Sequence, residues 1–217
     1  MLKVIGPHDR LNFGFLIVNT TSRSEEMWSR KLSPFFLGPI PLYEGRTAQN
    51  MENAWQFSKV YRDHLDEDGR ISERYWRWAS KGWDSDRAFR FPMGKGAKPE
   101  FSLWEGECLG YLEARERIYL PLYARAVVRT ESFSRLADLA ASQNIVLFDF
   151  DVYDLSAQEK TLGEALMDPS RKFGHGFVLY GLLTGEIDPE GRFVGTRPES
   201  PKSFHGDRIF PRTDSQQ

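Results

Sequence analysis

The 217-residue chain contains very little cysteine, and its histidines follow no metal-binding pattern. Its one cysteine, Cys108, has no partner for an internal disulfide, which agrees with a reducing compartment. The four histidines, at positions 8, 64, 175 and 205, show neither HxH nor HExxH spacing. A zinc site is therefore not expected. The GxxxxGK[ST] pattern of a phosphate-binding P-loop is also missing.

Long apolar runs and an excess of one charge are absent as well. No segment approaches eighteen continuous apolar residues, and the first nineteen residues are broken at Gly6 and Pro7. We therefore expect neither a membrane-spanning helix nor a signal peptide, and we predict a cytoplasmic protein. The net charge of −2 gives no overall field that would select nucleic acid, although a local basic patch could hold a phosphate group.

The residues that are abundant predict a globular fold. Apolar residues make up 40% of the chain and aromatic residues 14%, which is enough for a sizeable core. The chain length favours one domain. We expect a single domain over residues 1–185. Residues 186–217, rich in proline, glycine, arginine and serine, should form a partly flexible C-terminal extension.

Helical periodicity dominates the pattern of apolar residues. It predicts helices at 50–63, 71–83, 103–127, 132–142, 157–168 and 173–185, with a kink at Pro121. Strands are expected at 13–19, at 144–155, and as two short extended pieces within 40–48 around a turn at Glu44 and Gly45. The predicted fold class is α+β, predominantly α-helical with a few short strands.

The segment NMENAWQFSKVY, residues 50–61, places Glu52 just inside the start of a predicted helix. Gln56 and Lys59 follow at four and seven residues, so the three side chains share one helix face. A first-turn glutamate can simply favour the positive end of the helix dipole. However, this face borders Trp55, and a carboxyl beside an aromatic wall is partly desolvated. Its pKa then rises towards the range that a general acid or base needs.

Two further segments offer charged groups. The loop RFPMGKGAKP, residues 90–99, presents Arg90, Lys95 and Lys98 around two glycines, which suits an anion but also an ordinary surface loop.

Three acids, Asp149, Asp151 and Asp154, follow a predicted buried strand. They are candidates for functional carboxylates, and equally for caps and turns. No histidine pattern accompanies them, so we do not expect a metal.

Several segments together resemble one known family. Residues 32–61, LSPFFLGPIPLYEGRTAQNMENAWQFSKVY, resemble the opening motif of the NADAR domains, also called YbiA-like or RibX-like proteins, of which this chain would be a divergent member. In that motif an aromatic segment and a proline-bearing strand pair precede a helix with the pattern sxEhaxQaxK. Three later segments are similar to the family in the same order: 93–106, 133–150 and 174–183.

The resemblance implies a mainly helical YbiA-like fold and hydrolysis of N-glycosidic bonds to ribose 5-phosphate-type or ADP-ribose-type groups. It places the essential glutamate of the family on Glu52, and its glutamine and lysine on Gln56 and Lys59. The chain departs from the family at Asn53, where a histidine or tyrosine is usual. The family's YWGdG and GxGxN elements are replaced by FDFDVYDL and RKFGHG.

These observations lead to one chemical hypothesis. Cleavage of a ribosyl C–N bond passes through an oxocarbenium-like transition state, which glycosidases commonly handle with two carboxyl groups. Glu52 would act on the water or the sugar, and one of Asp149, Asp151 and Asp154 would be the second group. We expect substrate contacts from Trp55, Gln56, Lys59, Arg90, Lys95 and Lys98.

The expected partner is a nucleotide-like small molecule, such as a riboflavin-pathway intermediate or ADP-ribosyl-guanine, or an ADP-ribosylated nucleic acid, with no membrane, metal or cofactor involved. The alternative is a module that binds a nucleotide or ADP-ribose without cleaving it.

Overall fold

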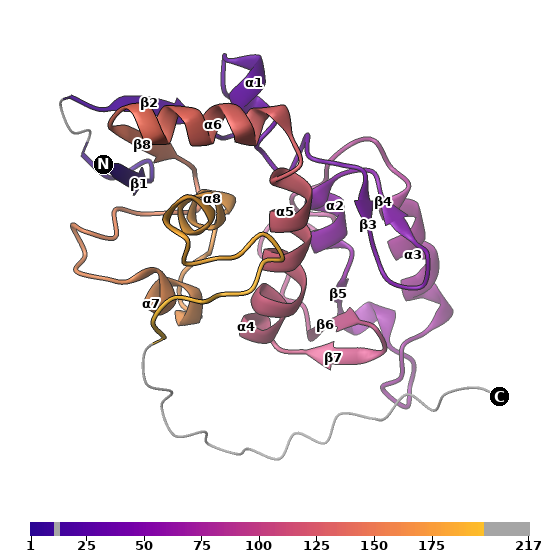
Figure 1. Cartoon of the computed structure of the whole chain (residues 1–217). Coiled ribbons are helices and arrows are strands. Elements are labelled where there is room, and N and C mark those ends of the chain that lie inside the picture. The colour runs from indigo at the N-terminus through magenta and orange to yellow at the C-terminus, as the bar shows by residue number, and fades with distance from the viewer. Residues whose placement is uncertain (11–13, 198–217) are drawn as a thin grey trace.

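The computed structural model describes residues 1–10 and 14–197, and its fold mixes helices with three small sheets (Figure 1). The largest sheet is parallel and has the order β1-β8-β2. Its strands are β1 (Leu2–Ile5), β8 (Ile145–Phe148) and β2 (Leu16–Asn19). The central strand, β8, has the sequence IVLF and is buried, as expected for a short apolar run between two neighbours.

Two antiparallel sheets lie on the other side of the molecule. One pairs β3 (Ile40–Pro41) with β4 (Thr47–Ala48), and its turn has positive φ at Glu44 and Gly45. This confirms the two extended pieces expected within 40–48. The other has the order β5-β6-β7, formed by β5 (Lys59–Val60), β6 (Phe101–Trp104) and β7 (Glu107–Leu109).

The helices are short, and three of them follow one another without a break through the middle of the molecule (Figure 1). The described helices are α1 (Met27–Arg30), α2 (Met51–Gln56), α3 (Glu73–Trp83), α4 (Tyr111–Ala114), α5 (Leu120–Val127), α6 (Glu131–Ser142), α7 (Leu162–Met167) and α8 (His175–Thr184). A 3-10 turn, η1 (Arg62–His64), follows β5, and a π-helical turn, η2 (Arg115–Tyr119), joins α4 to α5. The central rod α4-η2-α5 separates the parallel sheet from the region of α2 and α3 (Figure 1).

The prediction of a helix over 103–127 is wrong for residues 103–109. Residues 101–109 form the hairpin β6-β7, which turns through positive φ at Glu105 and Gly106. Cys108 therefore lies on a strand, where partial burial raises the pKa of its thiol. The expected irregularity at Pro121 takes another form, because the proline occupies the first turn of α5 directly after the π-helical turn.

Two other helices are shorter than expected. The helix predicted at 50–63 ends at Gln56, because Lys59 and Val60 pair with β6 instead. Tertiary strand pairing here overrides a helical pattern. The helix predicted at 157–168 begins at Leu162, where Thr161 forms a capping box with Glu164.

The remaining predicted elements agree more closely. Helices α3, α6 and α8 lie near the expected bounds, and β8 opens the segment predicted at 144–155 but ends at Phe148. Part of the expected C-terminal extension, 198–217, lies outside the described residues, as does the start of the strand predicted at 13–19. No helix within the described ranges is both long and apolar enough to cross a membrane.

Candidate functional site

A cavity of about 670 Å³ lies where the chain leaves β2 and β8. Residues 21–23 follow β2 and residues 149–151 follow β8, and both segments line it opposite helix α2. Ligands of open parallel sheets commonly bind outside the carboxyl ends of the strands. Eight of the residues singled out from the sequence line this cavity: Glu52, Trp55, Gln56, Lys59, Arg90, Lys95, Asp149 and Asp151.

Glu52 is enclosed by the protein. Its helix, α2, is capped by Asn50, whose side chain accepts a hydrogen bond of 2.9 Å from the Asn53 amide. The Glu52 residue is 8% exposed, and its Oε1 accepts a hydrogen bond of 2.9 Å from Nε2 of Gln56. Burial raises the pKa of Glu52, and the Gln56 hydrogen bond and the charges of Lys59 and Arg90 offset this only in part.

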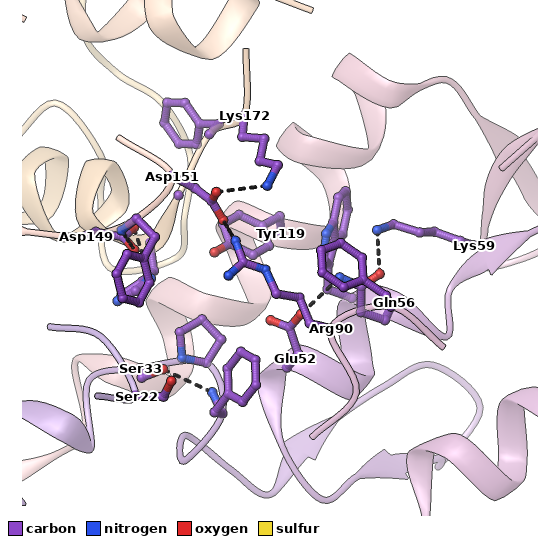
Figure 2. A pocket seen from close by; sticks show the side chains of 18 of the residues that line it. Ser22, Ser33, Glu52, Gln56, Lys59, Arg90, Tyr119, Asp149, Asp151 and Lys172 are labelled. Atoms are coloured by element: carbon purple, nitrogen blue, oxygen red, sulfur yellow. Dashed lines mark hydrogen bonds and ion pairs between the residues drawn. The ribbon is translucent and has the colours of Figure 1, made fainter. Parts of the chain in front are cut away.

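Lys59 continues this polar chain from strand β5. Its Nζ donates to Oε1 of Gln56 at 2.7 Å and lies 4.8 Å from the centre of the Trp55 ring. Desolvation lowers the pKa of Lys59 to about 8, although Glu52 acts in the opposite direction. The residues Glu52, Gln56 and Lys59 thus form one connected hydrogen-bond chain, with an acid at one end and an amine of lowered basicity at the other (Figure 2).

A second set of polar side chains, centred on Asp151, links the two sides of the cavity. Asp151 accepts a hydrogen bond of 2.6 Å from Nη2 of Arg90 and one of 3.0 Å from Nζ of Lys172 (Figure 2). The Arg90 and Asp151 side chains are 34% and 29% exposed, so this ion pair is partly open to solvent. Lys172 was not among the site residues predicted from the sequence. The only signal was the basic pair that opens the segment RKFGHG.

Asn53 fixes the segment that carries Arg90. It is fully buried, and its Nδ2 donates to the carbonyl oxygens of Ser85 and Arg87 at 3.0 and 2.9 Å. Its Oδ1 accepts a hydrogen bond of 2.9 Å from the Phe89 amide. The residue next to Glu52 therefore ties α2 to residues 85–89, directly before Arg90. From the sequence, Asn53 was noted only as a departure from a family pattern.

Asp149 is held in a buried pair with His175. The His175 Nδ1 lies 3.1 Å from Oδ2 of Asp149, and its Nε2 lies 2.8 Å from the carbonyl oxygen of Thr20. A carbonyl oxygen only accepts, so Nε2 donates to Thr20 while Nδ1 faces the carboxylate. Burial alone would lower the pKa of His175, but Asp149 raises it above its ordinary value.

The Asp149 carboxylate is also fully committed. It accepts hydrogen bonds from the amides of Phe150 and Gly176, at 2.6 and 3.0 Å. Burial alone would raise the pKa of Asp149, but His175 and these amides lower it. A side chain at Gly174 would collide with the Asp149 carboxylate, which explains why glycine precedes His175.

Two predicted site residues lie outside the lining of this cavity. Asp154 is buried in a turn, where its Oδ1 accepts a hydrogen bond of 3.1 Å from the Ala157 amide. This matches the capping and turn interpretation of that residue. Lys98 is exposed on the loop after Arg90. Asp154 thus separates from Asp149 and Asp151, because the strand ends at Phe148 and the chain turns away from the cavity before Asp154.

A family model described as a family of unknown function, DUF6939, matches residues 9–167. The chain belongs to DUF6939. The match includes Glu52, Arg90 and Asp151 and ends before Lys172 and His175. Comparison with curated proteins finds no match, and comparison with solved structures finds none either. The DUF6939 description carries no activity, so the resemblance to the YbiA-like proteins stays a prediction.

Proposed function

We propose that this protein hydrolyses a ribosyl C–N bond in a nucleotide-like or ADP-ribosylated compound, on a divergent YbiA-like fold. The observation that supports this most is the position of Glu52. Its carboxyl is enclosed in a cavity of about 670 Å³, within the usual size of small-molecule sites, and its pKa is raised. Titratable groups perturbed in this way are concentrated at catalytic sites.

In the proposed reaction Glu52 orients a water molecule and accepts its proton. The water oxygen forms a bond to the anomeric carbon, and the electron pair of the breaking C–N bond moves to the leaving nitrogen. Because the sugar becomes positive in the transition state, a carboxylate beside it is stabilising. The hydrogen bonds from Lys59 to Gln56 and from Gln56 to Glu52 fix the orientation of this carboxylate.

The rim of the cavity suits an anionic group on the substrate. Arg90, Lys95 and Lys172 line it and are partly or fully exposed. A substrate phosphate would replace Asp151 as a partner of Arg90 and Lys172, since phosphate offers the same type of acceptor with more charge. Trp55 lines the same cavity and would contact the base.

A second candidate function is binding without cleavage. It is favoured because none of the three aspartates is free to act as the second carboxyl group of the hydrolysis. Asp149 is committed to His175, Asp154 lies outside the cavity lining, and Asp151 is engaged with two cations. A nucleotide or ADP-ribose module needs no second carboxyl group.

Mass spectrometry separates these two functions. The protein is incubated with ADP-ribosylated guanine nucleosides, ADP-ribose and ribosylamino-pyrimidine phosphates. Release of the free base supports hydrolysis, whereas a thermal shift without a change in mass supports the binding module.

The variant Glu52→Gln tests the role of the carboxyl. A general base typically contributes about 10²–10⁴-fold, so we expect turnover to fall at least 100-fold while the fold is kept. The exposed Glu67→Gln serves as the matched control and should keep full turnover. Near-normal turnover of Glu52→Gln would remove Glu52 from the mechanism.

A further inference from the structure

The departing base in the proposed reaction gains negative charge, and the carboxylates around the cavity cannot stabilise it. An ionised carboxylate only accepts hydrogen bonds. Asp149 accepts from His175 and two backbone amides, and Asp151 accepts from Arg90 and Lys172. The cations at the rim are assigned to the anionic group of the substrate, so the base needs another donor that faces the cavity.

Tyr119 lies among these acids. It ends the π-helical turn η2 and lines the cavity, and Figure 2 draws it among Glu52, Asp149 and Asp151. π-Helical turns inside helices are frequent at functional sites. The ring is held on two sides, edge-on to Trp55 at 5.3 Å and stacked with Tyr123 at 6.3 Å between ring centres.

The hydroxyl of Tyr119 differs from those of Tyr123 and Tyr75, which are bonded inside the protein. Among the described residues, Tyr61 also lines the cavity with an unbonded hydroxyl, but Tyr119 is the one that lies among the acids. Tyr123 donates to the carbonyl oxygen of Leu32 at 2.6 Å, and Tyr75 donates to that of Phe57 at 3.1 Å. Within residues 1–10 and 14–197 the Tyr119 hydroxyl has no hydrogen-bond partner. This hydroxyl is not sealed inside the protein, unlike those of Tyr43 and Tyr153, which are fully buried and also have no hydrogen-bond partner among the described residues. A fixed donor is thus left open to a ligand in the cavity.

The charge environment keeps this hydroxyl protonated. Burial raises the pKa of Tyr119 well above its ordinary value, and the charges of Asp149, Glu52 and Asp151 act in the same direction. The phenol therefore remains a hydrogen-bond donor at neutral pH. It is too weak an acid to give up its proton completely, so its role is stabilisation by hydrogen bonding.

We infer that Tyr119 is a catalytic residue that donates a hydrogen bond to the departing base, an inference that rests on the proposed hydrolysis. Water forms the new C–O bond and gives one proton to Glu52, while the leaving nitrogen takes the electron pair of the C–N bond. Tyr119 stabilises the resulting anion until the proton held by Glu52, or one from solvent, neutralises it. The products are the free sugar and the neutral base.

The test measures how turnover depends on the leaving base. The substrates are ribose 5-phosphate N-glycosides of adenine, hypoxanthine and halogenated purines, which differ in the acidity of the leaving nitrogen. Loss of one such donor typically costs about 10²–10³-fold in kcat. We expect that loss in Tyr119→Phe for the poorest leaving base, a much smaller loss for the best one, and little change in KM.

The control variant is Tyr180→Phe, which removes the hydroxyl of a half-buried tyrosine outside the cavity lining. It should follow the wild type on every substrate. If Tyr119→Phe loses the same factor on all bases, or none, the donor role is wrong while the proposed hydrolysis stands. If the wild-type protein releases no base from any of these compounds or from those of the mass-spectrometry experiment, both proposals fail.

Discussion

At the scale of single residues, the cavity combines two charged groups whose burial works against ionisation. Glu52 and Lys59 sit at opposite ends of Gln56, and desolvation is the largest influence on the pKa of each. Burial favours the neutral form of both, while their attraction favours the charged forms. The protein therefore keeps a destabilising arrangement at this position, which is typical of a functional site.

The variant Lys59→Met tests this through the pH dependence of stability. The pKa of Lys59 falls from 10.5 to about 8 on folding, so between these values the unfolded chain binds more protons. The free energy of unfolding of the wild type should therefore rise as pH increases from 8 towards 10.5. The total contribution is at most about 3 kcal/mol.

Urea unfolding at pH 7, 8, 9 and 10 measures this effect, with the exposed Lys98→Met as control. The rise should be absent in Lys59→Met and present in Lys98→Met. An equal rise in the wild type and in Lys59→Met would show that the amine is not desolvated.

At the scale of elements, helix α2 is too short to hold its own position and depends on its neighbours. It has six residues, and isolated helices of that length are unstable. Its attachments are the Asn50 cap, the bond from the Glu52 amide to the Pro34 carbonyl oxygen, and the three side-chain bonds of Asn53. Asn53 therefore joins the helix that carries Glu52 to the loop that carries Arg90.

We predict that Asn53→Ala lowers the free energy of unfolding by about 2–4 kcal/mol, because buried backbone groups lose their partners. It should also raise KM for a phosphorylated substrate, because the segment before Arg90 is released. Denaturant unfolding and steady-state kinetics measure the two effects. Asn53→Asp keeps the acceptor for Phe89 but places a buried carboxylate oxygen against two carbonyl oxygens, so it should lose at least as much stability as Asn53→Ala. A loss below about 0.5 kcal/mol in Asn53→Ala would contradict this role.

The elements also show what the sequence could reveal. Helices with a local signal, such as α6 with its Thr130 cap, were predicted near their bounds. The hairpin β6-β7 was missed, because its first strand pairs with β5, about forty residues earlier in the chain. Lys59 was expected beside Gln56 on a helix, yet it reaches Gln56 from a strand. The prediction of proximity was right, but the reason for it was wrong.

Local sequence patterns could not identify the cavity residues that lie far from Glu52 in the sequence. Tyr119 reaches the cavity because of a π-helical turn, which no periodicity with 3.6 residues per turn predicts. Lys172 and His175 lie in the cavity wall because α8 begins beside the end of β8. Local patterns identified the acid at Glu52, whereas the partners that decide its chemistry depend on tertiary structure.

At the scale of the whole molecule, the cavity joins two parts of the chain that are far apart in sequence. One wall comes from α2 and the loop at Arg90, and the other comes from residues 149–151 and 172–175. The ion pair between Arg90 and Asp151 spans sixty-one positions in sequence and connects the two walls. A ligand that replaces this pair would contact both walls at once.

Hydrogen exchange tests this arrangement. A ligand at 100 times its Kd adds about 2.7 kcal/mol to stability when it binds only the folded state. We expect slower amide exchange on binding in two separate segments, near Glu52 and Arg90 and near Asp151 and His175. The β3-β4 turn is remote from the cavity and should not change beyond the global effect. Protection of one wall alone would show that the ligand does not bridge the cavity.

The position of β8 in the parallel sheet has a consequence for biosynthesis. Both outer strands, β1 and β2, are made first, yet among the described residues each pairs with β8 alone, so that Leu16 lies opposite Ile145. A ribosome adds roughly 5–20 residues per second, so the two outer strands exist for on the order of ten seconds before their shared partner emerges. During that time Val4 and Val18 have no sheet to pair with, so a chaperone that holds nascent apolar segments would bind in the region of β1 and β2.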